Sequence, residues 1–128
     1  MEVSVNEPGV LVLLSEHELA IKRLYEAFAG VFAERRDFWQ SLAREEQEHA
    51  DFLGTLPSRP ASDGLLQLGG ALKPQAITSS IAYVEGQIAR ARAGALTAVQ
   101  ALAIAKDLEH ALIEDMFSRV PTTAPADV

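Results

Sequence analysis

The chain has 128 residues and a formal net charge of −7, and 48% of its residues are hydrophobic. The acidic excess argues against nucleic acids and anionic membranes as partners, because both present negative charge. The absence of cysteine excludes disulfides, thiol catalysis and cysteine-held metal centres within this chain. The longest apolar run, residues 10–14, is too short to cross a bilayer and the first residues carry no basic leader, so we expect one cytoplasmic domain.

Apolar residues recur at steps of three and four through most of the chain, which predicts an all-α fold. Residues 1–9 carry a proline and a glycine and are expected to form a lead-in. A helix is predicted from Val10, and a short turn of charged residues at 34–36 joins it to a second helix, so the two helices are expected to be antiparallel neighbours. Residues 54–73 are rich in glycine and proline, and in helical bundles a connection of this length typically runs the length of the structure.

Two further helices are predicted in the second half of the chain. Pro74 is expected to open the third helix, because proline suits the first helical position. Thr97 and Gln100 match a capping box, which predicts the start of the fourth helix. We therefore expect an antiparallel four-helix bundle over residues 10–119, with a long crossover between helices 2 and 3, and a disordered tail over residues 120–128.

Each predicted helix carries one glutamate on its apolar stripe, and one helix adds a histidine a turn later. The glutamates are Glu18, Glu46, Glu85 and Glu109, and the histidine is His49. A carboxylate on a buried face is unfavourable unless it is paired or binds a cation. Carboxylate oxygens and imidazole nitrogens together suit iron or manganese. The pattern therefore predicts a metal site inside the core.

Several charged residues near this pattern have other interpretations. Ser15 and Glu18 would form a capping box if a helix began at Ser15, although the apolar periodicity already runs upstream of that residue. His17 lies beside Glu18 but is displaced from the stripe. Glu45 and Glu48 flank the second helix's motif and are expected on the solvated face.

Two segments of the chain resemble a known family. The stretch from Glu18 to Tyr25, followed by FWQSLAREEQEHA at residues 38–50, is similar to the first hairpin of rubrerythrin-type ferritin-like proteins. Residues 101–109, ALAIAKDLE, look like the last helix of these proteins. The resemblance covers residues 10–118 and implies a ferritin-like four-helix bundle with a di-iron carboxylate centre in its core.

The resemblance also implies roles for individual residues. The implied ligands are Glu18, Glu46, His49, Glu85 and Glu109. Two iron ions per chain are expected, with manganese as an alternative, and Glu46 and Glu109 would bridge them. Tyr25 would lie near the site as a hydrogen-bond partner or as a redox-active, catalytic side chain. The implied activity is oxidation of Fe(II) or reduction of peroxide or oxygen.

The chain departs from the family pattern in two ways. Leu112 stands where the second histidine is expected, three residues after Glu109. His110 lies about 100° around the helix from Glu109, so it would reach the site only through a distortion such as a π-bulge, and otherwise it is a surface histidine. The chain also lacks a cysteine-held rubredoxin module, so a peroxidase cycle would need an external reductant.

Two other hypotheses are consistent with the same residues. One is a ferritin-like scaffold that has lost its metal, and the other is a single-metal protein that uses Glu18, Glu46 and His49. The two differ from a di-iron enzyme in the number of ions bound. Apolar side chains expected on outer faces, such as Val31, Phe32 and Trp39, favour a homodimer. For Trp39, a place in the core is the alternative to a dimer contact.

Overall fold

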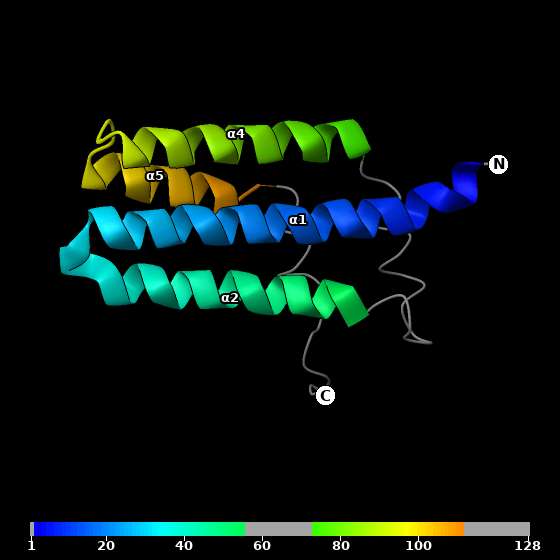
Figure 1. The fold of residues 1–128 in the computed structure, drawn as a ribbon, viewed down its shortest axis with the longest axis horizontal. Helices are drawn as coiled ribbons and strands as arrows, with labels where there is room; N and C mark the ends of the chain where they lie inside the picture. The colour runs from blue at the N-terminus through cyan, green and yellow to red at the C-terminus, as the bar shows by residue number, and fades with distance from the viewer. Residues whose placement is uncertain (1, 56–72, 112–128) are drawn as a thin grey trace. The chain divides into compact units, whose positions relative to one another are not determined.

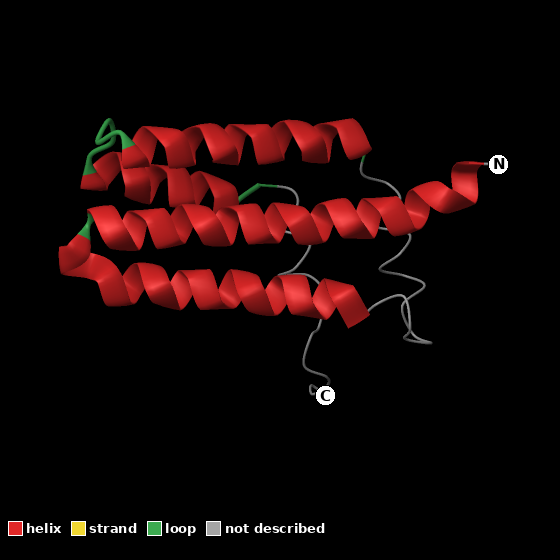
Figure 2. Cartoon of the chain, in the orientation of Figure 1, coloured by secondary structure: helices red, strands yellow, loops and turns green. Residues whose placement is uncertain are grey.

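The computed structural model describes residues 2–55 and 73–111, in which every regular element is a helix (Figure 1, Figure 2). The elements are α1 (Glu2–Val31), η1 (Ala33–Arg35), α2 (Arg36–Thr55), α4 (Pro74–Arg92) and α5 (Ala98–Glu109). The predicted all-α class is confirmed for this part of the chain. The chain divides into two units, Met1–Leu96 and Thr97–Val128, which are described separately. The four-helix bundle, its crossover and the tail stay predictions, and residues 56–72 and 112–128 lie outside the described part.

The first hairpin is formed by α1, η1 and α2. Helix α1 begins at Glu2, so residues 2–9 form its first turns and not the expected lead-in. Pro8 removes one backbone hydrogen bond but does not end the helix. Beyond Val31 the chain turns within η1, and α2 returns alongside α1 (Figure 1). The expected short connection between antiparallel neighbours is therefore confirmed.

Helix α1 is buried on two sides, because it packs against α2 and also against α4, which runs in the same direction as α1 (Figure 1). Neighbouring residues on a helix point about 100° apart, so a helix between two partners buries adjacent residues. The buried pairs on α1 are Val10 and Leu11, His17 and Glu18, Ala20 and Ile21, Leu24 and Tyr25, and Phe28 and Ala29. Two inward-facing rows thus replace the single stripe predicted for this helix.

Aromatic side chains fill the hairpin near its turn. The Trp39 ring lies 4.7 Å from the Phe28 ring in an edge-on arrangement and 5.7 Å from the Tyr25 ring. Trp39 is only 2% exposed, which confirms its predicted core position and excludes the alternative place on an outer face. Burial of this large apolar ring favours the core position. Val31 is 42% exposed, as expected.

The helix starts in the second half of the chain follow local rules. Pro74 lies in the first turn of α4, as predicted. The Thr97 hydroxyl accepts a hydrogen bond from the Gln100 backbone N–H at 3.1 Å, and the Gln100 side chain accepts one from the Thr97 N–H at 2.9 Å. This confirms the capping box of α5. Gly94 precedes it with a φ of 73°, a left-handed conformation that favours glycine.

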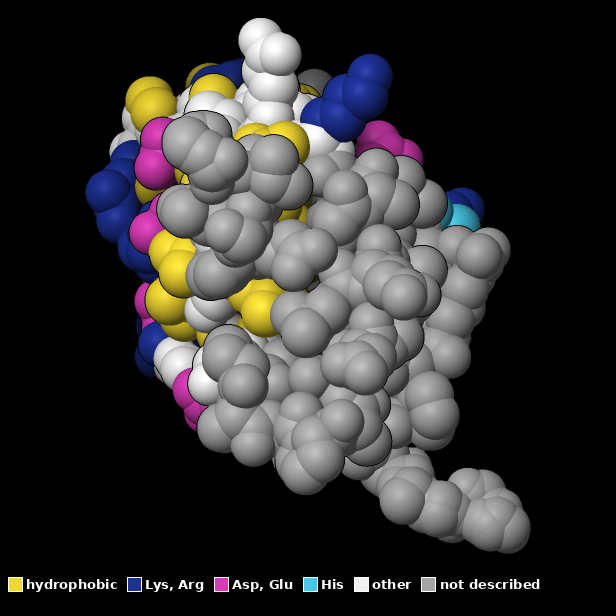
Figure 3. Space-filling view, turned by 90° about the vertical axis from the view of Figure 1, so that its right-hand side faces the viewer, with side chains coloured by type: hydrophobic (Ala, Val, Ile, Leu, Met, Phe, Trp, Pro, Cys, Tyr) yellow, Lys and Arg dark blue, Asp and Glu magenta, His cyan; other side chains and the backbone are white. Residues whose placement is uncertain are grey.

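The surface carries charges of both signs. On the face drawn in Figure 3, Lys and Arg side chains lie close to Asp and Glu side chains along one edge. Along this edge of the drawn face, the described side chains therefore do not form a uniformly basic surface of the kind that binds nucleic acid. No helix within residues 2–55 and 73–111 combines the length and apolarity needed to cross a lipid bilayer.

Candidate metal centre

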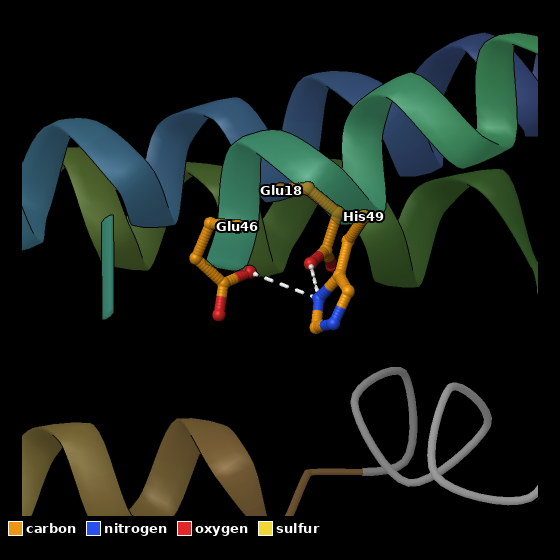
Figure 4. Close-up of side chains that lie close together, drawn as sticks. All are labelled: Glu18, Glu46 and His49. Atoms are coloured by element: carbon orange, nitrogen blue, oxygen red, sulfur yellow. Dashed lines mark hydrogen bonds and ion pairs between the residues drawn. The ribbon is translucent and has the colours of Figure 1, made fainter. Parts of the chain in front are cut away.

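Three side chains from the first hairpin meet in its interior. Glu18 comes from α1, and Glu46 and His49 come from α2 (Figure 4). Each offers one ligand atom, and the three atoms all lie within 4.8 Å of one another. The imidazole lies between the carboxylates: His49 Nδ1 is 3.1 Å from Glu18 Oε1 and 3.6 Å from Glu46 Oε1. In the described residues, these are the acidic and histidine side chains grouped closely enough to hold a cation.

Helix periodicity and hairpin register together bring the cluster about. Glu46 and His49 are one turn apart, so both project from one face of α2. Tyr25 follows Glu18 by seven residues, and Glu46 follows Trp39 by seven residues. The Tyr25–Trp39 ring contact therefore sets an antiparallel register that places Glu18 opposite Glu46 two turns further along.

Burial shapes the protonation of the cluster. Glu18 and Glu46 are 0% and 1% exposed, whereas the His49 side chain is 30% exposed. Loss of solvation raises the pKa of Glu46 from 4.5 to about 9, because a buried carboxylate loses its hydration. The hydrogen bond that His49 makes with Glu18, together with the nearby Glu46 carboxyl group, raises the pKa of His49 from 6.5 to about 10. At neutral pH and without a metal, Glu46 is therefore a neutral acid and His49 an imidazolium.

The spacing of the donor atoms fits a cation. Two ligands about 2.1 Å from one ion, at angles of about 90–120°, are about 3.0–3.6 Å apart. The two separations at His49 Nδ1 fall in this interval. Among the described residues, Glu46 Oε1 makes no hydrogen bond although it is buried, and such atoms are rare in proteins. Two carboxylates and one imidazole thus match a divalent transition metal in number, type and spacing.

Glu85 is not brought to the cluster. Its side chain is exposed on α4, although the periodicity predicted a place on the buried face. The buried residues of α4 are Ile77, Val84, Gln87, Ile88 and Ala91. Glu85 lies about 100° around the helix from Val84, beyond the edge of this face. The predicted stripe included Glu85 because it extended too far toward that side.

The fourth predicted glutamate, Glu109, belongs to the second unit. It is the last residue of α5 and its side chain is exposed, so its role as a bridging ligand stays a prediction. His110 is also exposed, and its Nδ1 lies 3.0 Å from the Lys106 carbonyl oxygen, to which an Nδ1–H donates. This bond at the helix end supports the interpretation of a surface histidine. Leu112 lies outside the described residues.

Tyr25 lies in the aromatic core of the hairpin. Its side chain is fully buried beside Phe28 and Trp39. Two helical turns separate it from Glu18, about 10 Å along the axis of α1. Its place near the proposed metal ligands and its catalytic role stay predictions.

His17 is a buried polar residue that the predicted stripe of α1 left out. Its side chain is 0% exposed, and its Nε2 lies 2.7 Å from Ser80 Oγ on α4. The signal was present in the sequence as adjacent apolar pairs along α1, which indicate a helix buried on two sides. Glu45 and Glu48 are exposed, as expected.

Comparisons of the chain with models of protein families, with curated proteins and with solved structures find no match. The resemblance to rubrerythrin-type proteins therefore stays a prediction based on short sequence segments. A functional assignment rests on the Glu18, Glu46 and His49 side chains and on their surroundings.

Proposed function

We propose that this protein binds a divalent transition metal, iron(II) foremost, at Glu18, Glu46 and His49, and uses it to oxidise Fe(II) or to reduce peroxide. One observation carries the proposal: two buried carboxylates and an imidazole converge from two helices, with ligand atoms all within 4.8 Å. Burying two carboxylates together is unfavourable without a cation or protons to neutralise them. Such a cluster is therefore better explained by cation binding than by a contribution to the stability of the fold.

The donor set supports a redox metal. Hard carboxylate oxygens with one nitrogen ligand suit Fe(II) and Mn(II), and three protein ligands leave coordination positions open for a co-substrate. A bound iron would supply one electron to peroxide or oxygen. Reduction of one peroxide to two waters consumes two electrons and two protons, so a second Fe(II) or an external reductant must supply the other electron.

The chain's own residues hold the ligands in place and carry protons. The imidazole of His49 contacts both carboxylates through Nδ1, which fixes the ring between them (Figure 4). Binding a cation requires loss of the protons on Glu46 and His49, because a metal ligand must present a free electron pair. These protons leave at Glu46 and at His49 Nδ1 as the ion binds. A metal-free scaffold would instead keep them at neutral pH.

The proposal is tested by metal binding to the whole chain under argon. Fe(II) is added, unbound iron is removed by dialysis, and bound iron is measured by mass spectrometry. We compare the wild type with Glu46→Gln, and with Glu45→Gln as a control at the neighbouring exposed position. We expect the wild type and the control to bind iron and Glu46→Gln to bind it at least about tenfold more weakly.

Admission of air or peroxide then tests the chemistry. Oxidation of the bound iron, followed by its absorption spectrum, should be faster than that of free Fe(II) at the same pH. Equal iron binding by all three proteins would place the iron elsewhere and refute the site. Binding without faster oxidation would retain the site and refute the redox activity.

A further inference from the structure

His17 is held between the cluster and helix α4. It lies on the side of α1 that faces α4, whereas its neighbour Glu18 lies on the side that faces α2. The Nε2 atom lies 2.7 Å from Ser80 Oγ, and the Nδ1 atom lies 3.6 Å from Glu18 Oε2. Among the described residues, Nδ1 makes no hydrogen bond although the side chain is fully buried. This nitrogen is thus aimed at a ligand of the proposed metal site.

Neither neutral form of the ring satisfies Nδ1. A neutral imidazole has one N–H donor and one nitrogen with a free electron pair. If Nε2–H donates to Ser80, the electron pair of Nδ1 faces a carboxylate oxygen, and the two repel each other. If Nδ1 carries the proton, the 3.6 Å separation from Glu18 Oε2 is too long for a hydrogen bond. A cation between Nδ1 and Oε2 would satisfy the first form completely.

We propose that His17 is a ligand for a second divalent cation, bound through His17 Nδ1 and Glu18 Oε2, so that Glu18 bridges two cations. The inference rests on the proposed function, because Glu18 is taken to bind the first cation through its other oxygen. Glu18 Oε1 lies 3.1 Å from His49 Nδ1, whereas Oε2 lies 3.6 Å from His17 Nδ1. Each oxygen of one carboxylate thus faces a different imidazole.

The geometry favours a second cation over a fourth ligand to the first. His17 is not in the group whose ligand atoms all lie within 4.8 Å of one another. Ligands of a single ion at about 2.1 Å are at most about 4.2 Å apart, so one ion does not reach all four side chains as they stand. Two cations that share a carboxylate are typically about 3.5–4 Å apart, which suits the two sides of Glu18.

Ser80 orients the His17 ring. Metal-bound histidines usually give their other ring N–H to an oxygen acceptor, which fixes the tautomer and the ring orientation. A hydrogen bond from Nε2–H to Ser80 Oγ fulfils that role and directs the electron pair of Nδ1 toward Glu18. Water would complete the coordination of this second cation.

The test uses Zn²⁺ as a diamagnetic probe of the metal-free chain. Bound Zn²⁺ is counted after equilibrium dialysis, and the ring nitrogens of ¹⁵N-labelled histidine are followed by NMR during the titration. The variants are His17→Gln and Ser80→Ala, with His110→Gln as a control at an exposed histidine. Circular dichroism confirms that each variant folds.

We expect two Zn²⁺ per wild-type chain, one per His17→Gln chain, and two per control chain. The second equivalent should move the Nδ1 resonance of His17 in the wild type, and Ser80→Ala should bind that equivalent about tenfold more weakly. An unmoved Nδ1 resonance, or equal counts in wild type and His17→Gln, would overturn the inference and leave His17 as a structural partner of Ser80. If His17→Gln does not fold, the wild-type NMR titration and Ser80→Ala decide the question.

The same experiment separates this inference from the proposed function. A wild type that binds one Zn²⁺, and loses it on Glu46→Gln substitution, would retain the first site and overturn only the role of His17. A wild type that binds no Zn²⁺ and no Fe(II) would overturn both.

Discussion

Replacing Glu46 by glutamine separates metal binding from the stability of the fold. The substitution exchanges one carboxyl oxygen for an amide group of nearly the same size at a position that is 1% exposed. Because burial raises the pKa of Glu46 to about 9, the native side chain is a neutral acid at pH 6–7 in the metal-free protein. Glutamine imitates that neutral form but is a poor metal ligand. We therefore expect metal binding to be lost while the metal-free fold keeps its stability near neutral pH.

The magnitude follows from proton linkage. The pKa of Glu46 is higher in the folded protein, at about 9, than its ordinary value of 4.5. Between these pH values the folded state binds more protons than the unfolded state, so the free energy of unfolding falls as pH rises. The destabilisation caused by ionising the buried Glu46 carboxyl group is absent below pH 4.5 and complete above pH 9. Over this interval the free energy of unfolding falls by up to about 1.4 kcal/mol per pH unit, and the substitution by glutamine removes this fall.

In both wild type and Glu46→Gln, His49 also makes the free energy of unfolding fall as the pH rises. Its pKa is raised from 6.5 to about 10, so its stabilising effect is complete below pH 6.5 and is lost as pH rises toward 10. Glu18 supplies the larger part of this shift and is present in wild type and Glu46→Gln alike. The difference between the two proteins therefore reports on Glu46, through its own titration and through its smaller contribution to the raised pKa of His49.

The assay is urea denaturation of the metal-free proteins in EDTA at several pH values from 5 to 9. The exposed Glu45→Gln variant is the matched control and should follow the wild type. We expect the wild type to lose stability with rising pH more steeply than Glu46→Gln. Parallel curves for wild type and Glu46→Gln would refute the argument, because they would show that Glu46 ionises as easily in the fold as in the unfolded chain.

Three further predictions follow from the structure. Binding of Zn²⁺ at pH 7 should release about two protons, one from Glu46 and one from His49. The number of released protons is measured by calorimetry in buffers of different ionisation enthalpy, and a number near zero would contradict the protonated state of Glu46 and His49. Trp39→Ala should lower the free energy of unfolding by about 3–5 kcal/mol, because it removes a buried ring, whereas Val31→Ala at an exposed position should change it by less than about 0.5 kcal/mol. Unfolding of both variants is followed by circular dichroism, and equal effects would exclude a core role for Trp39. Thr97→Ala should weaken the start of α5 by about 1 kcal/mol, seen as faster amide exchange in its first turn, and unchanged exchange would argue against the capping box.

Local sequence signals were enough for the helical class and for several helix starts. Pro74 and the Thr97 capping box depend on residues within one turn, so they can be recognised without the rest of the fold. The pairing of Glu18 with the second helix also followed from sequence, because a short connection forces two helices side by side and periodicity gives each an inward face.

The tertiary structure decided how many sides of each helix are buried and where each buried face ends. Helix α1 lies between two partners, which brings His17 inside beside Glu18, whereas a single-stripe interpretation left it out. Glu85 falls just beyond the buried edge of α4, although the same periodicity placed it within. Periodicity shows that residues share a side of a helix, but the edge of that side is set by the neighbours that pack against it. The grouping of Glu18, Glu46 and His49 was thus predictable from the sequence, whereas the burial of His17 and the exposure of Glu85 required the packing of α4 against α1.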